Sequence, residues 1–325
     1  MKNMLLRLGA LVLALLLSGC YTSVSIGEGT EVSKQVANLP IRTDNDTNEE
    51  LRALYYAALA LQNTQSDVVF SAEETALLDS FCQSQPGQFS VYCKDLYTGE
   101  SYLYGGTALY YPASLLKAPY ALWLCQQADE ESLDLEESLP NRFLGREQGT
   151  ALEDFNAQET IPARELLCAM IAQSDNNATE ILSGVWPGAG EFQSWLGTLG
   201  FSAPDTCAIL PGKGIEGMCT VTDMAAVWNA LYAYFESDAP NAAFLQGCFF
   251  DADHPGLSWP EYAPAARKYG SWDGAFHDAV LVYAVRPYIL VCMTDQGSES
   301  VDFPQMPVSA MEQLGGMIEE VLTNK

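Results

Sequence analysis

Apolar and polar positions alternate along residues 88–94, and the same alternation resumes at residues 100–104 after a turn over residues 95–99. This arrangement predicts a β-hairpin. Strand-like segments return only near the end of the chain, at residues 266–271, 277–285 and 288–294. The sequence therefore predicts five strands, which come from both ends of the chain.

The spacing of apolar residues between and around these strands is helical. It predicts a helix over residues 49–62 and a second helix that runs from Ser71 to about Cys82. Ser71 and Glu74 form a capping-box pattern at the start of that second helix. A mainly helical section follows from residue 113 to about residue 235, and a last helix covers residues 308–322.

This order of elements predicts an α+β fold. We expect an antiparallel five-stranded sheet flanked by helices, with an all-helical subdomain inserted at about residues 113–250. Clefts form where two such regions meet, so a binding site is expected between the sheet and the inserted helices.

The first twenty residues have the features of a targeting segment. A short basic region precedes an apolar run at residues 10–17 that is too short to cross a bilayer comfortably. The run ends in Leu17-Ser-Gly-Cys20, which resembles a bacterial lipobox; a plain signal peptide with a chance cysteine is the alternative. We expect residues 1–20 to be a lipoprotein signal peptide, residues 21–48 a flexible tether and residues 49–325 the folded domain.

A lipid on Cys20 would hold the protein on the extracytoplasmic side of a bacterial cell membrane. The formal net charge of −27 argues against nucleic acid as a partner, because such a chain is repelled by phosphate backbones. His254 and His277 are the only histidines and no Cys-x-x-Cys motif occurs, so we expect neither a metal nor a cofactor. We expect a monomer.

Eight of the nine cysteines remain after Cys20 is set aside. An even number can pair in an oxidising compartment, although buried free thiols are an equal alternative. The candidate pairs are Cys207 with Cys219, Cys93 with Cys292, and Cys125 with Cys168.

Ser114 and Lys117 are the first candidate for chemistry. Pro112 favours a helix that begins close to Ala113, and residues three apart share a helix face. The amine of Lys117 would then lie within reach of the Ser114 hydroxyl and, if desolvated, could activate it as a base. Pro119 lies early in the same helix, so a kink is expected.

A second candidate is Ser174-Asp175-Asn176, which follows a helical stretch at residues 164–171. Ser174 could relay a proton, and Asn176 could bind both a substrate carbonyl and Lys117. A helix cap or turn is the alternative, because all three residue types favour such positions.

The third candidate, Lys268-Tyr269-Gly270-Ser271, lies on a predicted strand. Lys268 offers a positive charge for a substrate carboxylate, and Gly270 allows a ligand to lie against the strand. The backbone N–H of Ser271 could bind an oxyanion together with that of Ser114. The alternative is an ordinary surface lysine on an edge strand.

Together, the order and spacing of the three motifs resemble the serine β-lactamase and penicillin-binding-protein superfamily, in particular class A β-lactamases. The resemblance extends over residues 71–325. It implies the following roles: Ser114 is acylated, Lys117 is the acylation base, Ser174 and Asn176 handle the proton relay and the substrate amide, Lys268 and Gly270 shape the carboxylate pocket with Tyr269, and the N–H groups of Ser114 and Ser271 form the oxyanion hole.

Two features depart from that family. Tyr269 stands where the family has a threonine or serine that binds the substrate carboxylate. The segment 201–220 lacks the Glu-x-x-x-Asn pattern that holds the deacylating water in class A enzymes, and Asp205 and Glu216 are the acids there that could substitute.

Three functions are consistent with these features. The resemblance implies a class A-like enzyme that opens β-lactam amides; the alternatives are a D-alanyl-D-alanine carboxypeptidase or related cell-wall peptidase, and a non-catalytic module that binds wall fragments or β-lactams. Other serine hydrolase designs fit less well. The chain lacks a Gly-x-Ser-x-Gly elbow, and the adjacent His277 and Asp278 would point to opposite faces of a strand.

Overall fold

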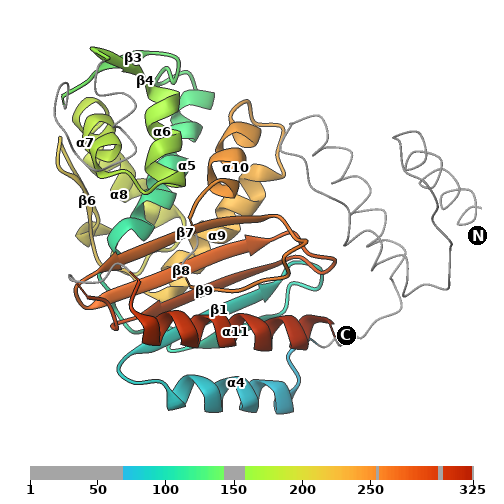
Figure 1. Ribbon diagram of the computed structural model, residues 1–325. Helices are drawn as coiled ribbons and strands as arrows, with labels where there is room; N and C mark the ends of the chain where they lie inside the picture. Colours follow the sequence, from blue (N-terminus) through green and yellow to red (C-terminus); the bar gives the residue numbers. More distant parts are fainter. Residues whose placement is uncertain (1–68, 143–157, 254–255, 299–302, 324–325) are drawn as a thin grey trace, which may run out of the picture. The chain divides into compact units, whose positions relative to one another are not determined.

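The computed structural model describes residues 69–142, 158–253, 256–298 and 303–323. The predictions for Cys20, for residues 1–48 and for a helix at residues 49–62 lie outside these ranges. Figure 1 shows the arrangement of the described elements.

The main sheet has five antiparallel strands, as the sequence predicts. Its order is β2-β1-β9-β8-β7, so both ends of the chain contribute to it. The strands are β1 (Phe89–Asp95), β2 (Ser101–Tyr104), β7 (Ala265–Trp272), β8 (Ala275–Val282) and β9 (Tyr288–Thr294). β9 has the predicted bounds, whereas β8 begins two residues earlier and ends three residues earlier than predicted.

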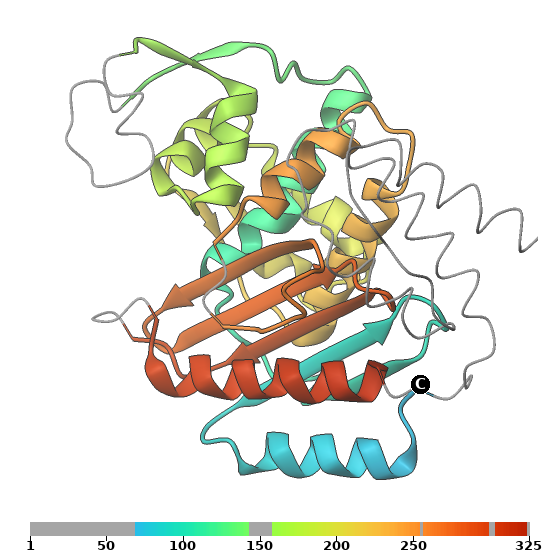
Figure 2. The same ribbon diagram turned by 45° about the vertical axis from the view of Figure 1, so that its right-hand side comes forward.

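Helices cover both faces of this sheet (Figures 1 and 2). One face carries α4 (Ala72–Ser84) and α11 (Gln305–Thr323). The helical block lies on the other face and comprises η1 (Ala113–Leu116), α5 (Lys117–Asp129), α6 (Ala163–Ala172), α7 (Asn176–Val185), α8 (Ala189–Thr198), η3 (Pro204–Thr206), α9 (Val221–Phe235) and α10 (Ala242–Phe250). Within the block, the pattern analysis missed two short hairpins: β3 (Ser138–Pro140) with β4 (Thr160–Pro162), and β5 (Ala208–Leu210) with β6 (Gly214–Glu216).

Two hydrophobic cores follow from this layering. Phe276 and Val280 of β8 belong to the core beneath α4 and α11, whereas Ala279 and Leu281 belong to the core shared with the helical block. Every residue of β8 is buried, because successive side chains enter opposite cores.

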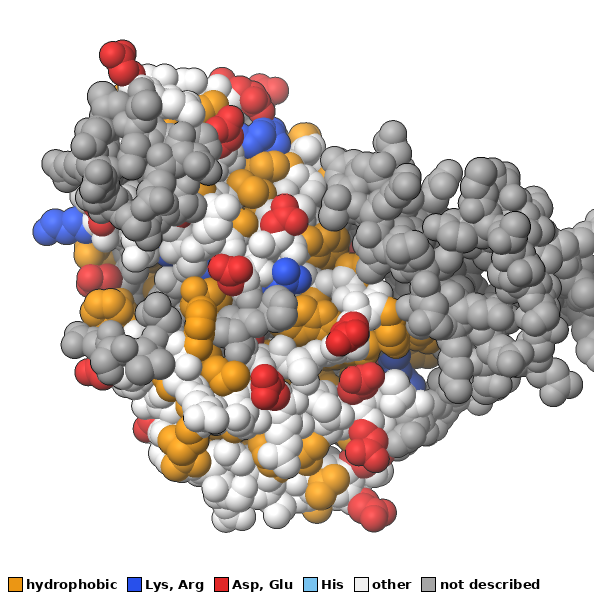
Figure 3. All heavy atoms as spheres, viewed as in Figure 1, with side chains coloured by type: hydrophobic (Ala, Val, Ile, Leu, Met, Phe, Trp, Pro, Cys, Tyr) orange, Lys and Arg blue, Asp and Glu red, His pale blue; other side chains and the backbone are white. Residues whose placement is uncertain are grey.

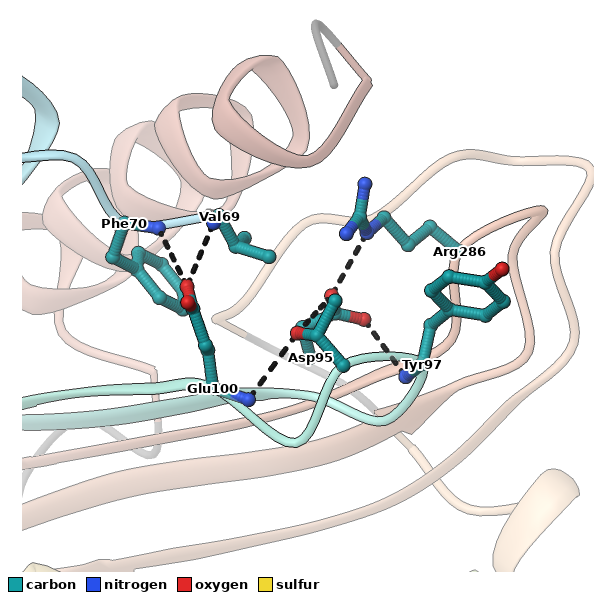
Figure 4. A network of polar contacts seen from close by, with 7 residues as sticks. Val69, Phe70, Asp95, Tyr97, Glu100 and Arg286 are labelled. Carbon is teal, nitrogen blue, oxygen red and sulfur yellow. Dashed lines mark hydrogen bonds and ion pairs between the residues drawn. The ribbon is translucent and has the colours of Figure 1, made fainter. Parts of the chain in front are cut away.

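The ends of the first elements are held by polar contacts. Ser71 and Glu74 form the predicted capping box at α4, with the Glu74 carboxylate accepting from the Ser71 N–H at 2.9 Å. Figure 4 shows a second network around the β1–β2 hairpin. Glu100 accepts from the N–H of Val69 at 2.7 Å, and Asp95 pairs with Arg286 at 2.9 Å. The hairpin is thereby tied to the start of α4 and to the β8–β9 connection.

None of the three predicted disulfides is formed, since the eight described cysteines are free thiols. Cys93 lies opposite Leu290, and Cys292 lies opposite Val91. The two cysteines are therefore diagonal neighbours on adjacent strands, which is too far apart for a disulfide without backbone movement. Cys168 contacts Cys248 of α10, and the Sγ of Cys207 contacts the carbonyl of Met218 at 3.8 Å.

Acidic side chains are scattered over the face seen in Figure 3, where lysine and arginine are fewer. This distribution agrees with the excess of 42 acidic over 15 basic residues. Among the helices of the described ranges, none is both long enough and apolar enough to cross a bilayer.

Candidate active site

Ser114 lies in a short turn between the sheet and the buried helix α5. The turn is the 3-10 helix η1, and α5 begins at Lys117. Pro119 is the third residue of α5, where the backbone N–H of any residue would have no acceptor within the helix. The proline is therefore accommodated in the first turn of α5. The 3-10 helix changes to an α-helix just before Pro119, close to the position where a kink was predicted.

Two strained backbone positions lie at the candidate site, one of them in η1. Ala113, directly before Ser114, has a φ of 50°, and Ser174 has a φ of 56°. These are two of the three non-glycine residues with positive φ in the described ranges. Such conformations cost about 1–3 kcal/mol each and persist only where surrounding contacts hold them. Both strained residues lie at the motifs that the sequence singled out.

Lys117 is the centre of the site. Its side chain is 5% exposed, and its Nζ donates to the Ser174 carbonyl at 2.5 Å and to Asn176 Oδ1 at 2.7 Å. The Ser174 hydroxyl lies 3.4 Å away. Burial lowers the pKa of Lys117 to about 7, against a smaller opposing effect of the Asp175 charge. The predicted contact between Asn176 and Lys117 is thus present, whereas no hydrogen bond joins Lys117 to Ser114 in the described chain.

The turn between α6 and α7 serves the site and the fold together. Asp175 is the N-cap of α7, and its Oδ1 accepts from the N–H of Ala178 at 2.7 Å. Ser174 and Asn176 flank this cap and point polar atoms at Lys117. A helix cap was the alternative interpretation of this motif. In the structure the cap is present, and it holds Ser174 and Asn176 beside Lys117. Sequence reasoning missed that Asp175 acts on Lys117.

Lys268 is buried, so its interpretation as a surface lysine is wrong. It is 1% exposed although β7 is an edge strand of the sheet. Its Nζ donates to the Tyr269 carbonyl at 3.2 Å and lies 4.7 Å from the centre of the Tyr269 ring. Burial, and then the like charge of Lys117, hold its pKa well below the usual value. An anionic ligand beside Lys268 would favour the charged form of this amine.

Gly270 is the contact point between β7 and η1. A Cβ at this position would lie 2.4 Å from the Pro112 carbonyl oxygen, 2.8 Å from the Leu115 nitrogen and 3.2 Å from the Ser114 nitrogen. The backbone of η1 occupies the space where a side chain of residue 270 would project. That a ligand lies against the edge of this strand stays a prediction. The Ser114 nitrogen thus lies close to the strand that carries Ser271. Their joint binding of an oxyanion remains a prediction.

We expect Gly270→Ala to destabilise the fold by about 3 kcal/mol, because the new methyl group would overlap backbone atoms that cannot rotate away. Urea unfolding of both proteins measures the change. Gly316→Ala in α11 is the matched control, since a Cβ there meets nothing within 4 Å. Equal unfolding midpoints for wild type and Gly270→Ala would contradict the tight contact.

Tyr269 belongs to the opposite side of β7. Alternate residues of a strand share a face, so Tyr269 lies on the face of Ala265, which belongs to the core beneath α4 and α11. Lys268 lies on the face of Ala266, which belongs to the core shared with the helical block. Its ring lies 5.5 Å from that of Phe303, edge to face. Tyr269 therefore packs as an aromatic residue and is a poor substitute for a short hydroxyl side chain.

The two acids of residues 201–220 lie on different elements. Asp205 is in η3, which packs against α8. Glu216 is exposed in β6, and its charge contributes to raising the pKa of Tyr111 after the larger effect of burial. Within the described ranges no carboxylate is hydrogen-bonded to Lys117. That Asp205 or Glu216 substitutes for the missing Glu-x-x-x-Asn pattern stays a prediction.

His277 and Asp278 point to opposite faces of β8, as predicted. The His277 Nε2 lies 2.8 Å from the Tyr111 carbonyl on the helical side, and Asp278 accepts from the Leu257 N–H at 2.8 Å on the other side. Sequence reasoning considered His277 only as a triad member. The apolar residues on both sides of His277 and Asp278 were the signal that this histidine is buried. No cluster that could bind a metal occurs among the residues the structure describes.

The comparisons with known proteins agree with this arrangement. A family model described as the Beta-lactamase enzyme family matches residues 73–321. No curated protein matches the chain. A mutant of PBP-A, solved as an acyl-enzyme complex with penicillin G, is 21% identical, with a TM-score of 0.62 over 78% of this chain and 97% of that one.

Two β-lactamase structures show the same fold. The protein from Burkholderia vietnamiensis is 19% identical, with a TM-score of 0.63 over 78% of this chain and 98% of its own. The protein from Chitinophaga pinensis is 18% identical, with a TM-score of 0.61 over 76% and 98%. At such identities the likeness concerns the fold, and the chemistry must be argued from the site.

Proposed function

Because the chain belongs to the Beta-lactamase enzyme family, we propose that it is a serine hydrolase that opens β-lactam amides through an acyl-enzyme on Ser114. The observation that carries this proposal is the environment of Lys117. A neutral amine has two N–H donors and one lone pair. The donors are engaged by the Ser174 carbonyl and Asn176 Oδ1. The lone pair is then free to accept the proton of the Ser114 hydroxyl.

The proposed reaction uses these groups as follows. Ser114 Oγ bonds to the lactam carbonyl carbon while its proton passes to Lys117. The C–N bond then breaks, and the leaving nitrogen takes a proton from Lys117 through Ser174 Oγ, which lies 3.4 Å from that amine. Lys268 attracts the substrate carboxylate, and the N–H groups of Ser114 and Ser271 stabilise the oxyanion.

Intact-mass measurement over time with a penicillin tests the proposal. We expect an adduct of one penicillin mass on the wild-type protein. An adduct that disappears within minutes supports β-lactamase turnover, whereas no adduct contradicts the proposal and favours a binding module.

One observation favours a second function. The segment 201–220 lacks the Glu-x-x-x-Asn pattern, and neither Asp205 nor Glu216 makes a hydrogen bond to Lys117 in the described chain. A cell-wall peptidase acting on D-alanyl-D-alanine peptides would use the same acylation machinery and hold a penicillin for hours. Release of D-alanine from such a peptide, together with a long-lived penicillin adduct, would support this function.

The membrane anchor at Cys20 is also proposed rather than observed. Mass analysis of the protein from native membranes would detect the acyl chains, and an unmodified cysteine on the mature protein would contradict the anchor.

A further inference from the structure

His277 is a buried histidine that the acylation mechanism does not use. It is 0% exposed and lies on β8, an interior strand of the sheet. The backbone N–H of Thr294 donates to its Nδ1 at 3.2 Å. An N–H group can only donate, so Nδ1 is the acceptor and the proton of the neutral ring resides on Nε2. Nε2 therefore donates to the Tyr111 carbonyl, 2.8 Å away.

The accepting carbonyl belongs to the segment that leads into the nucleophile turn. Tyr111 precedes Ser114 by three residues. The preceding residue, Tyr110, is held by two backbone hydrogen bonds with Cys219, at 2.9 and 3.0 Å, and its ring stands edge-on to His277 at 5.5 Å. The segment is thus fixed at Tyr110 and Tyr111 before the chain turns into η1.

The other side of the nucleophile turn rests on the partner strand of β8. Gly270 of β7 lies directly opposite His277 in the strand register. It touches the Pro112 carbonyl and the Ser114 nitrogen, as its absent side chain permits. His277 and Gly270 therefore hold the two ends of the short stretch that contains the strained Ala113.

A strained backbone keeps its conformation only while the contacts around it leave no relaxed alternative. Without the hydrogen bond from His277, the Tyr111 carbonyl would be free to turn, and the peptide before Ala113 could relax. The shift would move Ser114 relative to Lys117, which is anchored separately by Ser174 and Asn176. Binding of a substrate carboxylate by Lys268 would be affected less.

We propose that His277 is a positioning residue that holds the Tyr111 carbonyl and thereby keeps the Ser114 turn in its strained, reactive conformation. This inference rests on the proposed acylation of Ser114. Burial lowers the pKa of the histidine to about 4, so at neutral pH the ring keeps one donor and one acceptor in this arrangement.

Three variants test this role. His277→Leu removes both hydrogen bonds, His277→Gln keeps an N–H donor and an oxygen acceptor, and Leu281→Ala removes a buried side chain from the same face of β8, away from the nucleophile turn. Acylation by a fluorescent penicillin is measured at a temperature where all variants are folded. We expect His277→Leu to lose about 100-fold in the first-order acylation rate, with a change of no more than about threefold in non-covalent affinity.

We expect His277→Gln to recover at least tenfold of the lost rate. Leu281→Ala is expected to lower the melting temperature and to leave the acylation rate unchanged. Equal rates in wild type and His277→Leu, or a parallel loss in Leu281→Ala, would overturn the inference.

Hydrogen exchange of the peptide covering residues 110–116 provides a readout that needs no substrate. Exchange should rise in His277→Leu and remain at the wild-type level in Leu281→Ala and His277→Gln. Unchanged exchange in His277→Leu overturns the inference. Failure of wild-type protein to form an adduct overturns the proposed function instead, so the two failures are distinguishable.

Discussion

Replacing Ser114 with alanine is expected to abolish covalent labelling by a fluorescent penicillin. The hydroxyl of Ser114 is the proposed nucleophile. Among the described serines, only Ser114 has a buried lysine three residues later together with a β7 glycine against its backbone. In the proposed mechanism the neighbouring groups bind substrate or move protons, so the alanine variant has no hydroxyl that can be acylated. Gel fluorescence and intact mass measure the labelled fraction.

The matched control for this variant is Ser194→Ala, which removes an exposed hydroxyl from α8. We expect it to be labelled as fast as the wild type. Labelling that persists in Ser114→Ala would show that a different residue is the nucleophile, and the peptide that carries the label would identify it.

Replacing Lys117 with methionine is expected to lower the acylation rate by about a thousandfold or more. Methionine fills a similar volume but offers no base, and general base catalysis typically contributes about 10²–10⁴-fold. Lys117→Arg should fail as well, because a guanidinium remains protonated. In the wild type the rate should rise with pH, with a midpoint near the pKa of about 7, since only the neutral amine can accept a proton.

Stability provides an independent check on Lys117. Its pKa is lowered on folding, so between about pH 8 and about pH 10 the unfolded chain binds more protons at this position than the native chain does. The stability of the wild type relative to Lys117→Met should therefore rise by roughly 1.4 kcal/mol per pH unit in this window. Urea unfolding of both proteins at several pH values measures the difference. A constant difference would mean that the lysine is not desolvated in the native state.

Glu216 is an exposed acid that could take part in hydrolysis of the acyl-enzyme. If the wild-type acyl-enzyme proves short-lived, the deacylating water must be activated by a carboxylate that makes no hydrogen bond to Lys117. Glu216 is a better candidate than Asp205, because its charge contributes to raising the pKa of Tyr111, which lies three residues before Ser114. A Glu216→Gln variant would then prolong the adduct.

Local signals in the sequence were good guides to the elements of the fold. Alternation placed the five strands to within a few residues, because one strand face or both enter a core. The capping box at Ser71 placed the start of α4, because its two hydrogen bonds form between residues three apart. The short β3–β4 and β5–β6 hairpins escaped detection, because three residues are too few to show a period.

Motif order alone was enough to associate Ser114, Lys117, Ser174, Asn176, Lys268 and Gly270 with one site, and the family match agrees with that association. Tertiary structure decided the chemistry of these residues. The burial of Lys117 and Lys268, and hence the lowered pKa of each, depends on elements that are distant in the chain. Lys117 and Ser174 are 57 positions apart in the chain, and Tyr111 and His277 are 166 positions apart, yet a hydrogen bond joins each pair. No local pattern encodes such contacts, since desolvation and hydrogen bonding across the sheet arise only when the whole chain packs.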